Sequence, residues 1–164
     1  KNSLIENNQQ VLTYLLENTT VSTNEQTGEL SPTVRFIDFE NLDLSKLEKD
    51  EQEMISHIEE LKAKHEKLMN QFSFGYLSDV LYESFWFVFC DKYIENSKKK
   101  IGNFSEGEYV REDSDSADNI RAVLNYSLRV YLILLHPMIP FITEKVWQFS
   151  QKKQGSIMFE NYLK

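Results

Sequence analysis

The chain has 164 residues, enough for one domain with a hydrophobic core, and 41% of its residues are hydrophobic. Only five glycines and three prolines occur, which argues against a turn-rich β fold and for long helices. The net charge of −8 is unfavourable for nucleic-acid binding, but residues 71–164 hold 11 basic against 12 acidic side chains, so a nucleic-acid surface would have to lie there.

The first segment, residues 1–18, is predicted to be a helix because its apolar residues recur at helical spacing. They are Leu4, Ile5, Val11, Leu12, Leu15 and Leu16. Residues 19–43 lack this pattern, and so long a stretch without structure is unusual in a compact domain. Their polar composition favours an irregular insertion, and the alternative is a short strand or hairpin.

Residues 44–72 carry the longest amphipathic pattern, with Glu and Lys opposite the apolar face. That face comprises Leu44, Leu47, Met54, Ile55, Ile58, Leu61, Leu68, Met69 and Phe72. A helix of this length spans about 43 Å. Ser45 followed by Glu48 predicts a capping box at its start. The apolar face could form a coiled coil, but packing against neighbouring helices is favoured.

Residues 74–100 are predicted to form the most buried helix, because their apolar arc is wide. One stripe is Leu77, Leu81, Phe85 and Val88, and another is Tyr82, Trp86, Phe89 and Tyr93. Gly102 is the expected stop signal. The run Lys98-Lys99-Lys100 suits the negative end of a helix.

A polar linker is expected over residues 101–114, followed by a helix over residues 116–136 with carboxylates at its start. Pro137 disfavours helical geometry at His136, so that helix should end there. Pro140 suits the first turn of a new helix. The sequence therefore predicts a tight corner that folds a short aromatic helix back onto the core.

The sequence contains no complete catalytic or metal-ligating pattern. His65-Glu66 opens a zinc-protease pattern, but Met69 stands where the second His is needed. There is no phosphate-binding glycine loop. The lone cysteine, Cys90, excludes an internal disulfide and is interpreted as a buried structural thiol. Trp86 and Trp147 are interpreted as core residues, with base stacking as the alternative.

Two runs carry a family resemblance. Residues 134–148 read LLHPMIPFITEKVWQ and residues 81–95 read LYESFWFVFCDKYIE. The first resembles the LHPxxPFITEExWQ segment of the anticodon-binding domain of class I aminoacyl-tRNA synthetases. The second resembles the LYxFFWxxFCDWYIE helix of the valyl enzymes in particular, and residues 156–158 are similar to the valyl pattern after the last helix.

The resemblance implies an all-α bundle of about five helices, with residues 1–164 as one domain and residues 19–43 as an irregular insertion. It implies binding of the tRNA anticodon stem-loop, in particular that of tRNA(Val). The HIGH and KMSKS signatures of the catalytic domain are missing, and the chain begins at Lys1 without an initiator Met. We therefore expect a fragment that is inactive alone and holds no cofactor or metal. In the full enzyme the fragment would support ATP-dependent attachment of valine by the catalytic domain.

The candidate RNA-contacting residues are chosen by charge, since the matched runs mainly hold core and corner positions. They are Lys92, Lys98, Lys99, Lys100, Arg111, Arg121 and Arg129. Lysines and arginines position phosphates. The alternative for the three adjacent lysines is that they merely complement the helix dipole.

Three other functions stay open. One is the anticodon-binding domain of an isoleucyl or leucyl relative, and another is a non-enzymatic scaffold that binds protein partners through the 44–72 helix. A helical-bundle enzyme is disfavoured by the failed ligand patterns. A cytoplasmic protein is expected, without contact to a membrane, because no apolar run reaches membrane-spanning length and no secretory signal is visible.

Overall fold

The computed structural model describes the backbone of residues 21–23, 30–32, 46–105, 108–111, 114–151 and 155–160, with the side chains of 46–102, 114–148 and 155–160. The chain divides into two compact units, Lys1–Ile37 and Asp38–Lys164. The single domain over residues 1–164 stays a prediction, and the predicted helix over residues 1–18 lies outside the described residues.

The described part of the first unit is a short hairpin. Strands β1 (Val21–Thr23) and β2 (Leu30–Pro32) pair antiparallel, with Ser22 opposite Ser31. This hairpin is the alternative that the sequence left open beside an irregular insertion over residues 19–43.

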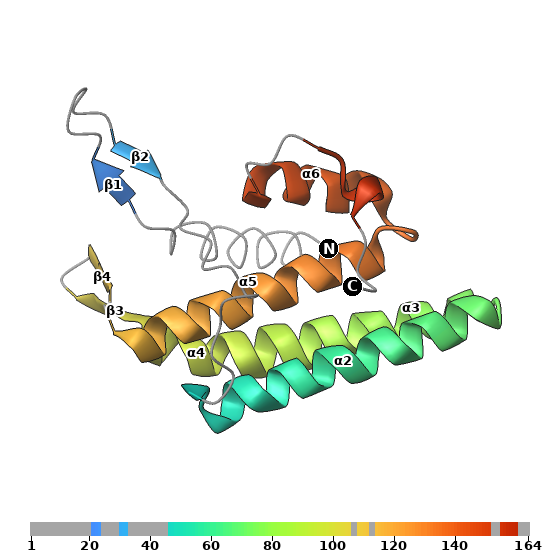
Figure 1. The fold of residues 1–164 in the computed structure, drawn as a ribbon, viewed down its shortest axis with the longest axis horizontal. Coiled ribbons are helices and arrows are strands. Elements are labelled where there is room, and N and C mark those ends of the chain that lie inside the picture. The colour runs from blue at the N-terminus through green and yellow to red at the C-terminus, as the bar shows by residue number, and fades with distance from the viewer. Residues whose placement is uncertain are drawn as a thin grey trace. The chain divides into compact units, whose positions relative to one another are not determined.

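The second unit is a helical bundle, which confirms the all-α class. Its helices are α2 (Lys49–Asn70), α3 (Phe74–Glu83), the π-helix η3 (Ser84–Ile94), α4 (Glu95–Ile101), α5 (Asp115–Leu135), α6 (Pro140–Gln151) and the 3-10 turn η4 (Ile157–Phe159). Because α3, η3 and α4 follow one another without a break, they form one rod that lies beside α2 and α5, while α6 folds back along α5 (Figure 1). None of the helices described here is long and apolar enough to cross a membrane.

Helix α2 buries one face at a spacing of three and four residues, as predicted. The buried residues are Glu51, Met54, Ile58, Leu61, His65 and Leu68. The helix begins later than expected, because Glu48 is its N-cap and makes no side-chain capping bond. The predicted capping box of Ser45 and Glu48 is therefore wrong, since Glu48 is the N-cap residue itself and not the third residue of the helix.

The C-terminus of α2 explains why Phe72 is not part of the core. Phe72 has a φ of 54°, the left-handed region where glycine is usual. The N–H of Phe72 bonds the carbonyl of Met69 at 3.0 Å, and the N–H of Ser73 bonds that of Leu68 at 3.0 Å. These two bonds form a Schellman motif, which reverses the chain toward α3 and leaves the Phe72 ring 79% exposed.

The π-helix changes which residues of the rod face the core. Hydrogen bonds between residues five apart place Ser84, Phe89 and Ile94 on one buried face. The stripes predicted from α-helical spacing are therefore only partly correct: Tyr82 is 54% exposed, and Trp86 is half-buried and not a core residue.

The polar linker predicted over residues 101–114 contains a hairpin that was not predicted. Strands β3 (Gly102–Ser105) and β4 (Glu108–Arg111) form an antiparallel hairpin directly after α4. Helix α5 then begins after Ser114, whose side chain accepts a hydrogen bond from the N–H of Ala117 at 3.2 Å.

The corner between α5 and α6 is confirmed, and a hydrogen bond between His136 and Thr143 spans it. The Thr143 hydroxyl lies 3.0 Å from the carbonyl oxygen of Ile139 and 2.8 Å from Nδ1 of His136. Because a carbonyl can only accept, the hydroxyl donates to it and accepts from His136. This arrangement fixes α6 on α5 and buries Trp147 to 1% exposure, as predicted.

Candidate nucleic-acid interface

Three of the predicted basic residues lie along the η3–α4 rod. Lys92 is exposed and its Nζ lies 3.6 Å from Glu53 of α2. Lys98 pairs with Glu95 one turn earlier, and Lys99 is exposed. Exposed ion pairs contribute little to stability, so a phosphate can displace these carboxylates. We call Lys92, Lys98 and Lys99 the basic edge.

Lys100 belongs to the bundle instead. Its Nζ lies 2.8 Å from Glu48 and 3.3 Å from Asp50, at the start of α2. The hydrogen bond from Lys100 and one from Ser116 at 2.9 Å lower the pKa of Glu48. The hydrogen bond to Glu48 in turn raises the pKa of Lys100. Lys100 thus joins α4 to the N-terminus of α2, and both are tied to α5 through Ser116.

Arg121 bonds within the bundle, and its predicted contact with RNA stays a prediction. The residue is 7% exposed, and Nη2 of its guanidinium donates to the carbonyl oxygen of Ile101 at 2.8 Å. Nη1 donates to Asp118 at 2.8 Å. Since Ile101 is the last residue of α4, Arg121 caps that helix from α5. The side chain of Arg111 lies outside the described residues, so its predicted contact stays a prediction.

Arg129 lies apart from the basic edge, on α5. Its Nη2 donates to Glu160 at 2.6 Å, and its guanidinium lies 5.5 Å from the centre of the Trp147 ring. The structure therefore places Lys92 and the three lysines of α4 along one rod. Arg121 instead bonds the end of α4, and Arg129 pairs with Glu160.

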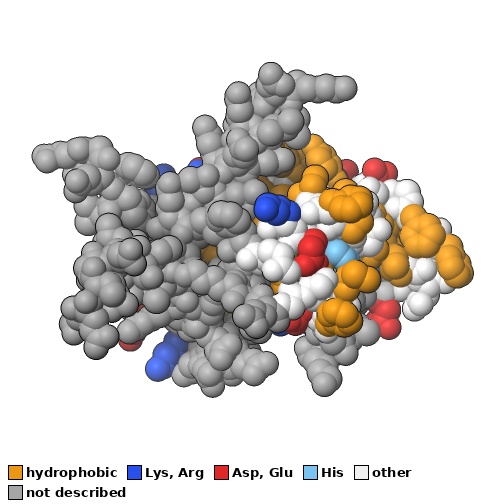
Figure 2. All heavy atoms as spheres, turned by 90° about the horizontal axis from the view of Figure 1, so that it is seen from above, with side chains coloured by type: hydrophobic (Ala, Val, Ile, Leu, Met, Phe, Trp, Pro, Cys, Tyr) orange, Lys and Arg blue, Asp and Glu red, His pale blue; other side chains and the backbone are white. Residues whose placement is uncertain are grey.

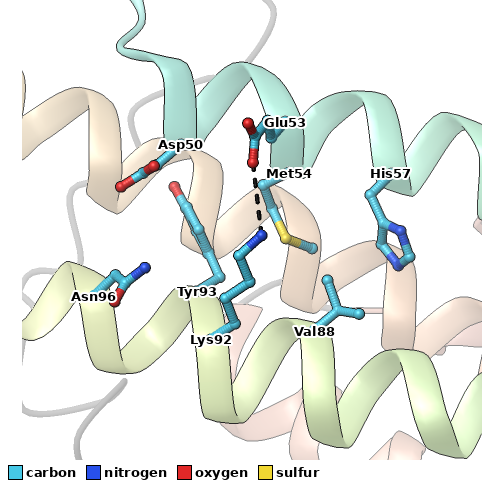
Figure 3. A pocket seen from close by; sticks show the side chains of 8 residues that line it. All are labelled: Asp50, Glu53, Met54, His57, Val88, Lys92, Tyr93 and Asn96. Atoms are coloured by element: carbon cyan, nitrogen blue, oxygen red, sulfur yellow. Dashed lines mark ion pairs between the residues drawn. The ribbon is translucent and has the colours of Figure 1, made fainter.

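A pocket of about 300 Å³ opens between α2 and η3, next to the basic edge (Figure 3). It is lined by Asp50, Glu53, Met54, His57, Val88, Lys92, Tyr93 and Asn96. In Figure 3 the Lys92 amine points across the pocket to Glu53. Asp50 and Glu53 are not among the site residues predicted from the sequence. The signal that could have found them is the spacing of Asp50, Glu53 and His57 along α2.

A chain of hydrogen bonds leads from His57, which lines this pocket, to Tyr131 on α5. Nε2 of His57 lies 2.7 Å from Oγ of Ser84, which lies 2.7 Å from the Tyr131 hydroxyl. The Tyr131 hydroxyl also donates to the Ser84 carbonyl at 3.2 Å. Burial lowers the pKa of His57 and that of His65 and raises the pKa of Tyr131 to about 12. These groups are therefore neutral at physiological pH and hold the helices together.

The two histidines predict a loss of stability on acidification. The pKa values of both histidines are depressed in the folded state. Their contribution to the stability of the fold is therefore fully present above the unfolded pKa of about 6.5 and is lost as the pH falls. Glu51, whose pKa is raised by burial, opposes this at lower pH. The free energy of unfolding should therefore fall between about pH 7.5 and pH 5.5, and less so in His65→Leu. Urea titrations at both pH values measure this, and a constant or rising stability would refute it.

Among the described residues, neither the cysteine nor a cluster of metal-ligating side chains offers catalytic chemistry. Burial raises the pKa of Cys90 to about 12, so this thiol is not a nucleophile, as predicted. No three His, Cys, Asp or Glu side chains of the described residues gather as a metal site requires.

Residues 51–164 match the family described as the anticodon-binding domain of tRNA ligase. The chain belongs to this family. The match covers the helical bundle from α2 to the C-terminus, and with it the basic edge, the corner and η4.

Curated relatives in the family are valine–tRNA ligases. The enzyme of Staphylococcus haemolyticus is 33% identical over 111 residues, which are 67% of this chain and 12% of that protein. The enzyme of Enterococcus faecalis is 31% identical over 109 residues, covering 66% and 12%. The enzyme of Staphylococcus epidermidis is 34% identical over 110 residues, again 66% and 12%. The match thus spans about one eighth of these relatives' length, and no solved structure gave a significant match.

Proposed function

We propose that this chain binds the anticodon stem-loop of tRNA(Val) as part of a valine–tRNA ligase. The observation that carries the proposal is the family match over residues 51–164, supported by valine–tRNA ligases as relatives. In the longer enzyme a catalytic domain would attach valine to the tRNA with ATP in the cytoplasm. The chain would contribute binding and orientation, so alone it should neither activate valine nor charge tRNA.

The basic edge is the proposed phosphate contact. Lys92, Lys98 and Lys99 share one rod. The carboxylate partners of Lys92 and Lys98 are exposed, and backbone phosphates can replace them without leaving a buried charge behind. We leave Lys100 and Arg121 out of the proposed contact, because each makes hydrogen bonds inside the bundle, Lys100 to Glu48 and Asp50 and Arg121 to Ile101 and Asp118.

A binding comparison between two hairpins tests the function. One hairpin copies the anticodon arm of tRNA(Val) and the other copies its acceptor arm, at equal length and salt. The purified chain should bind the anticodon hairpin at least tenfold more tightly. Equal binding to the two hairpins would show that the chain recognises charge alone, and preference for the acceptor arm would contradict the proposal.

The basic edge predicts a change in salt dependence. Each phosphate contact on single-stranded RNA contributes about −0.7 to the slope of log affinity against log salt. Lys98→Gln with Lys99→Gln should therefore flatten the slope by about 1–1.5 units and leave the unfolding free energy nearly unchanged. Gel-shift titrations at several salt concentrations measure the slope.

Lys100→Gln is the matched control for this experiment. It removes a charge from the same helix end, but it breaks the pairs with Glu48 and Asp50. We expect an unfolding free energy about 0.5–1 kcal/mol lower, with the salt slope of the unmodified chain. If Lys100→Gln flattens the slope and the Lys98–Lys99 variant does not, the phosphate contact has been assigned to the wrong lysines.

A further inference from the structure

A buried hydroxyl group lines the pocket between α2 and η3 and is not bonded inside the bundle. Tyr93 is 4% exposed, and its hydroxyl makes no hydrogen bond to any part of the chain that the structure describes. The hydroxyl of Ser97, one turn later, donates to the backbone carbonyl of Tyr93 at 2.7 Å instead. Burial raises the pKa of Tyr93, so its hydroxyl keeps the proton. A buried polar group without a partner costs stability, and it points to a ligand that would complete it.

The hydroxyl faces a pocket that is suited to a polar ligand. In Figure 3 it points toward α2, on the side where Asp50 and Glu53 lie. Figure 2 shows hydrophobic side chains gathered at one end of the face seen from above, whereas six of the eight side chains that line the pocket carry polar atoms. Its volume of about 300 Å³ is at the lower end of the range for small-molecule sites, about 300–1,000 Å³. A single heterocyclic ring is a ligand of suitable size.

The carboxylates of the pocket select a ligand that donates hydrogen bonds. Glu53 is half exposed and lies 3.6 Å from Lys92 and 3.5 Å from Lys49, both longer than the roughly 2.7–3.2 Å of a hydrogen bond. Its oxygens can therefore accept further bonds, and a carboxylate accepts only from a donor such as an amine. Lys100 lies 3.3 Å from Asp50. Two ammonium groups already lie beside these carboxylates, which disfavours a metal cation as the ligand.

The other walls of the pocket suit a flat ring that carries a phosphate. Met54 and Val88 are the apolar lining residues and can contact the face of a ring. Lys92 belongs both to the pocket and to the basic edge, which continues to Lys98 and Lys99 on the same rod. A ligand that uses all these groups is a nucleotide whose base has an exocyclic amine. Asp and Glu side chains accept from such an amine when they bind cytosine.

We propose that the pocket receives one unstacked anticodon base, adenine or cytosine, with its phosphate on the basic edge. This inference rests on the proposed function. Valine codons begin with GU, so the second and third anticodon bases of tRNA(Val) are adenine and cytosine. Each presents an amine beside an accepting ring nitrogen on its Watson–Crick edge, the edge by which proteins read splayed-out RNA bases. The amine donates to Glu53 and the Tyr93 hydroxyl donates to the ring nitrogen.

Tyr93→Phe tests the role of the hydroxyl, because it removes that group alone. The hydroxyl is unpaired in the fold, so the unfolding free energy should not fall, while the affinity for the anticodon hairpin should fall at least fivefold. Tyr126→Phe is the matched control: it removes a hydroxyl that donates to Glu59 at 2.7 Å, outside the pocket, and should change the affinity less than twofold. Unchanged binding by Tyr93→Phe would overturn the proposal, since it would show that solvent alone satisfies the hydroxyl.

Altered RNA tests the proposed amine contact with the unmodified chain. Hairpins are made with purine in place of the anticodon adenine, or with 2-pyrimidinone in place of the cytosine, so that each lacks one amine. At one of the two positions the loss should weaken binding at least fivefold, and it should weaken binding of Glu53→Ala less than twofold. The ion pairs of Glu53 are exposed, so this variant should remain folded. Equal losses in both proteins, or no loss at either position, would contradict the assignment.

Titrations with AMP and CMP distinguish an RNA base from a free nucleotide, which offers the same chemistry. If either nucleotide binds through Tyr93 while hairpin binding is the same in Tyr93→Phe, the pocket serves a free nucleotide and the proposal is overturned. The proposed function fails separately, namely when the unmodified chain does not prefer the anticodon hairpin to the acceptor hairpin. A preserved preference combined with unchanged binding by Tyr93→Phe overturns only the assignment of the pocket.

Discussion

Trp147→Ala should lower the free energy of unfolding by about 3–5 kcal/mol, which makes it the most damaging single change we predict. Trp147 is 1% exposed, and its ring lies between α6 and the guanidinium of Arg129 on α5. Removing it leaves a cavity where α6 meets α5 and removes a cation–π contact. At about 2–4 °C per kcal/mol for a chain of this size, the melting temperature should fall by roughly 6–20 °C.

Phe141→Ala is the matched control, because it removes another large aromatic ring from the same helix. That ring is 90% exposed, so the isolated chain should change by less than about 0.5 kcal/mol. Calorimetry or urea titration of both variants measures the difference. Equal stability of the two variants would show that α6 does not pack on α5 through Trp147.

Arg121→Ala should cost about 2–4 kcal/mol, because its hydrogen bonds from a charged group are lost inside the bundle. The carbonyl of Ile101 at the end of α4 would be left without its 2.8 Å donor. Asp118 is 44% exposed and can be hydrated, so no isolated charge remains buried. Arg121→Lys should recover little, since one ammonium group cannot reproduce the forked geometry of the guanidinium.

The same variant tests whether Arg121 stabilises the bundle or contacts RNA. At a temperature where Arg121→Ala is still folded, its affinity for the anticodon hairpin should equal that of the unmodified chain. Full stability combined with weaker RNA binding would restore Arg121 to the RNA contact, where its charge had first placed it.

The corner and the all-α class could be predicted because local residues determine them. Pro137 and Pro140 restrict the backbone wherever they occur, and the apolar spacing of α2 repeats over six turns. The Schellman motif at Phe72 could not be predicted, because its signal is a glycine and the chain has phenylalanine there. The π-helix likewise has no simple sequence signal, and it shifts the buried face to Ser84, Phe89 and Ile94.

The candidate site was harder to predict than the fold, because charge alone does not show which partner a side chain meets. The carboxylates that bind Lys100 lie 50 and 52 residues away in the sequence, and the carbonyl that binds Arg121 lies 20 residues away. Neither partner is visible in the local sequence. The basic residues that we keep in the proposed contact are Lys92 and Lys98, which pair with Glu53 and Glu95, and Lys99, which is exposed.

The central claim is that this chain recognises an anticodon, and one binding measurement tests it most directly. The affinity of the chain is measured for tRNA(Val) and for the same tRNA with its three anticodon bases replaced, at one salt concentration. Because base contacts supply discrimination while phosphate contacts do not, the replaced tRNA should bind at least tenfold more weakly. Equal affinity for the two tRNAs would contradict the claim, because it would show that the chain contacts only the RNA backbone.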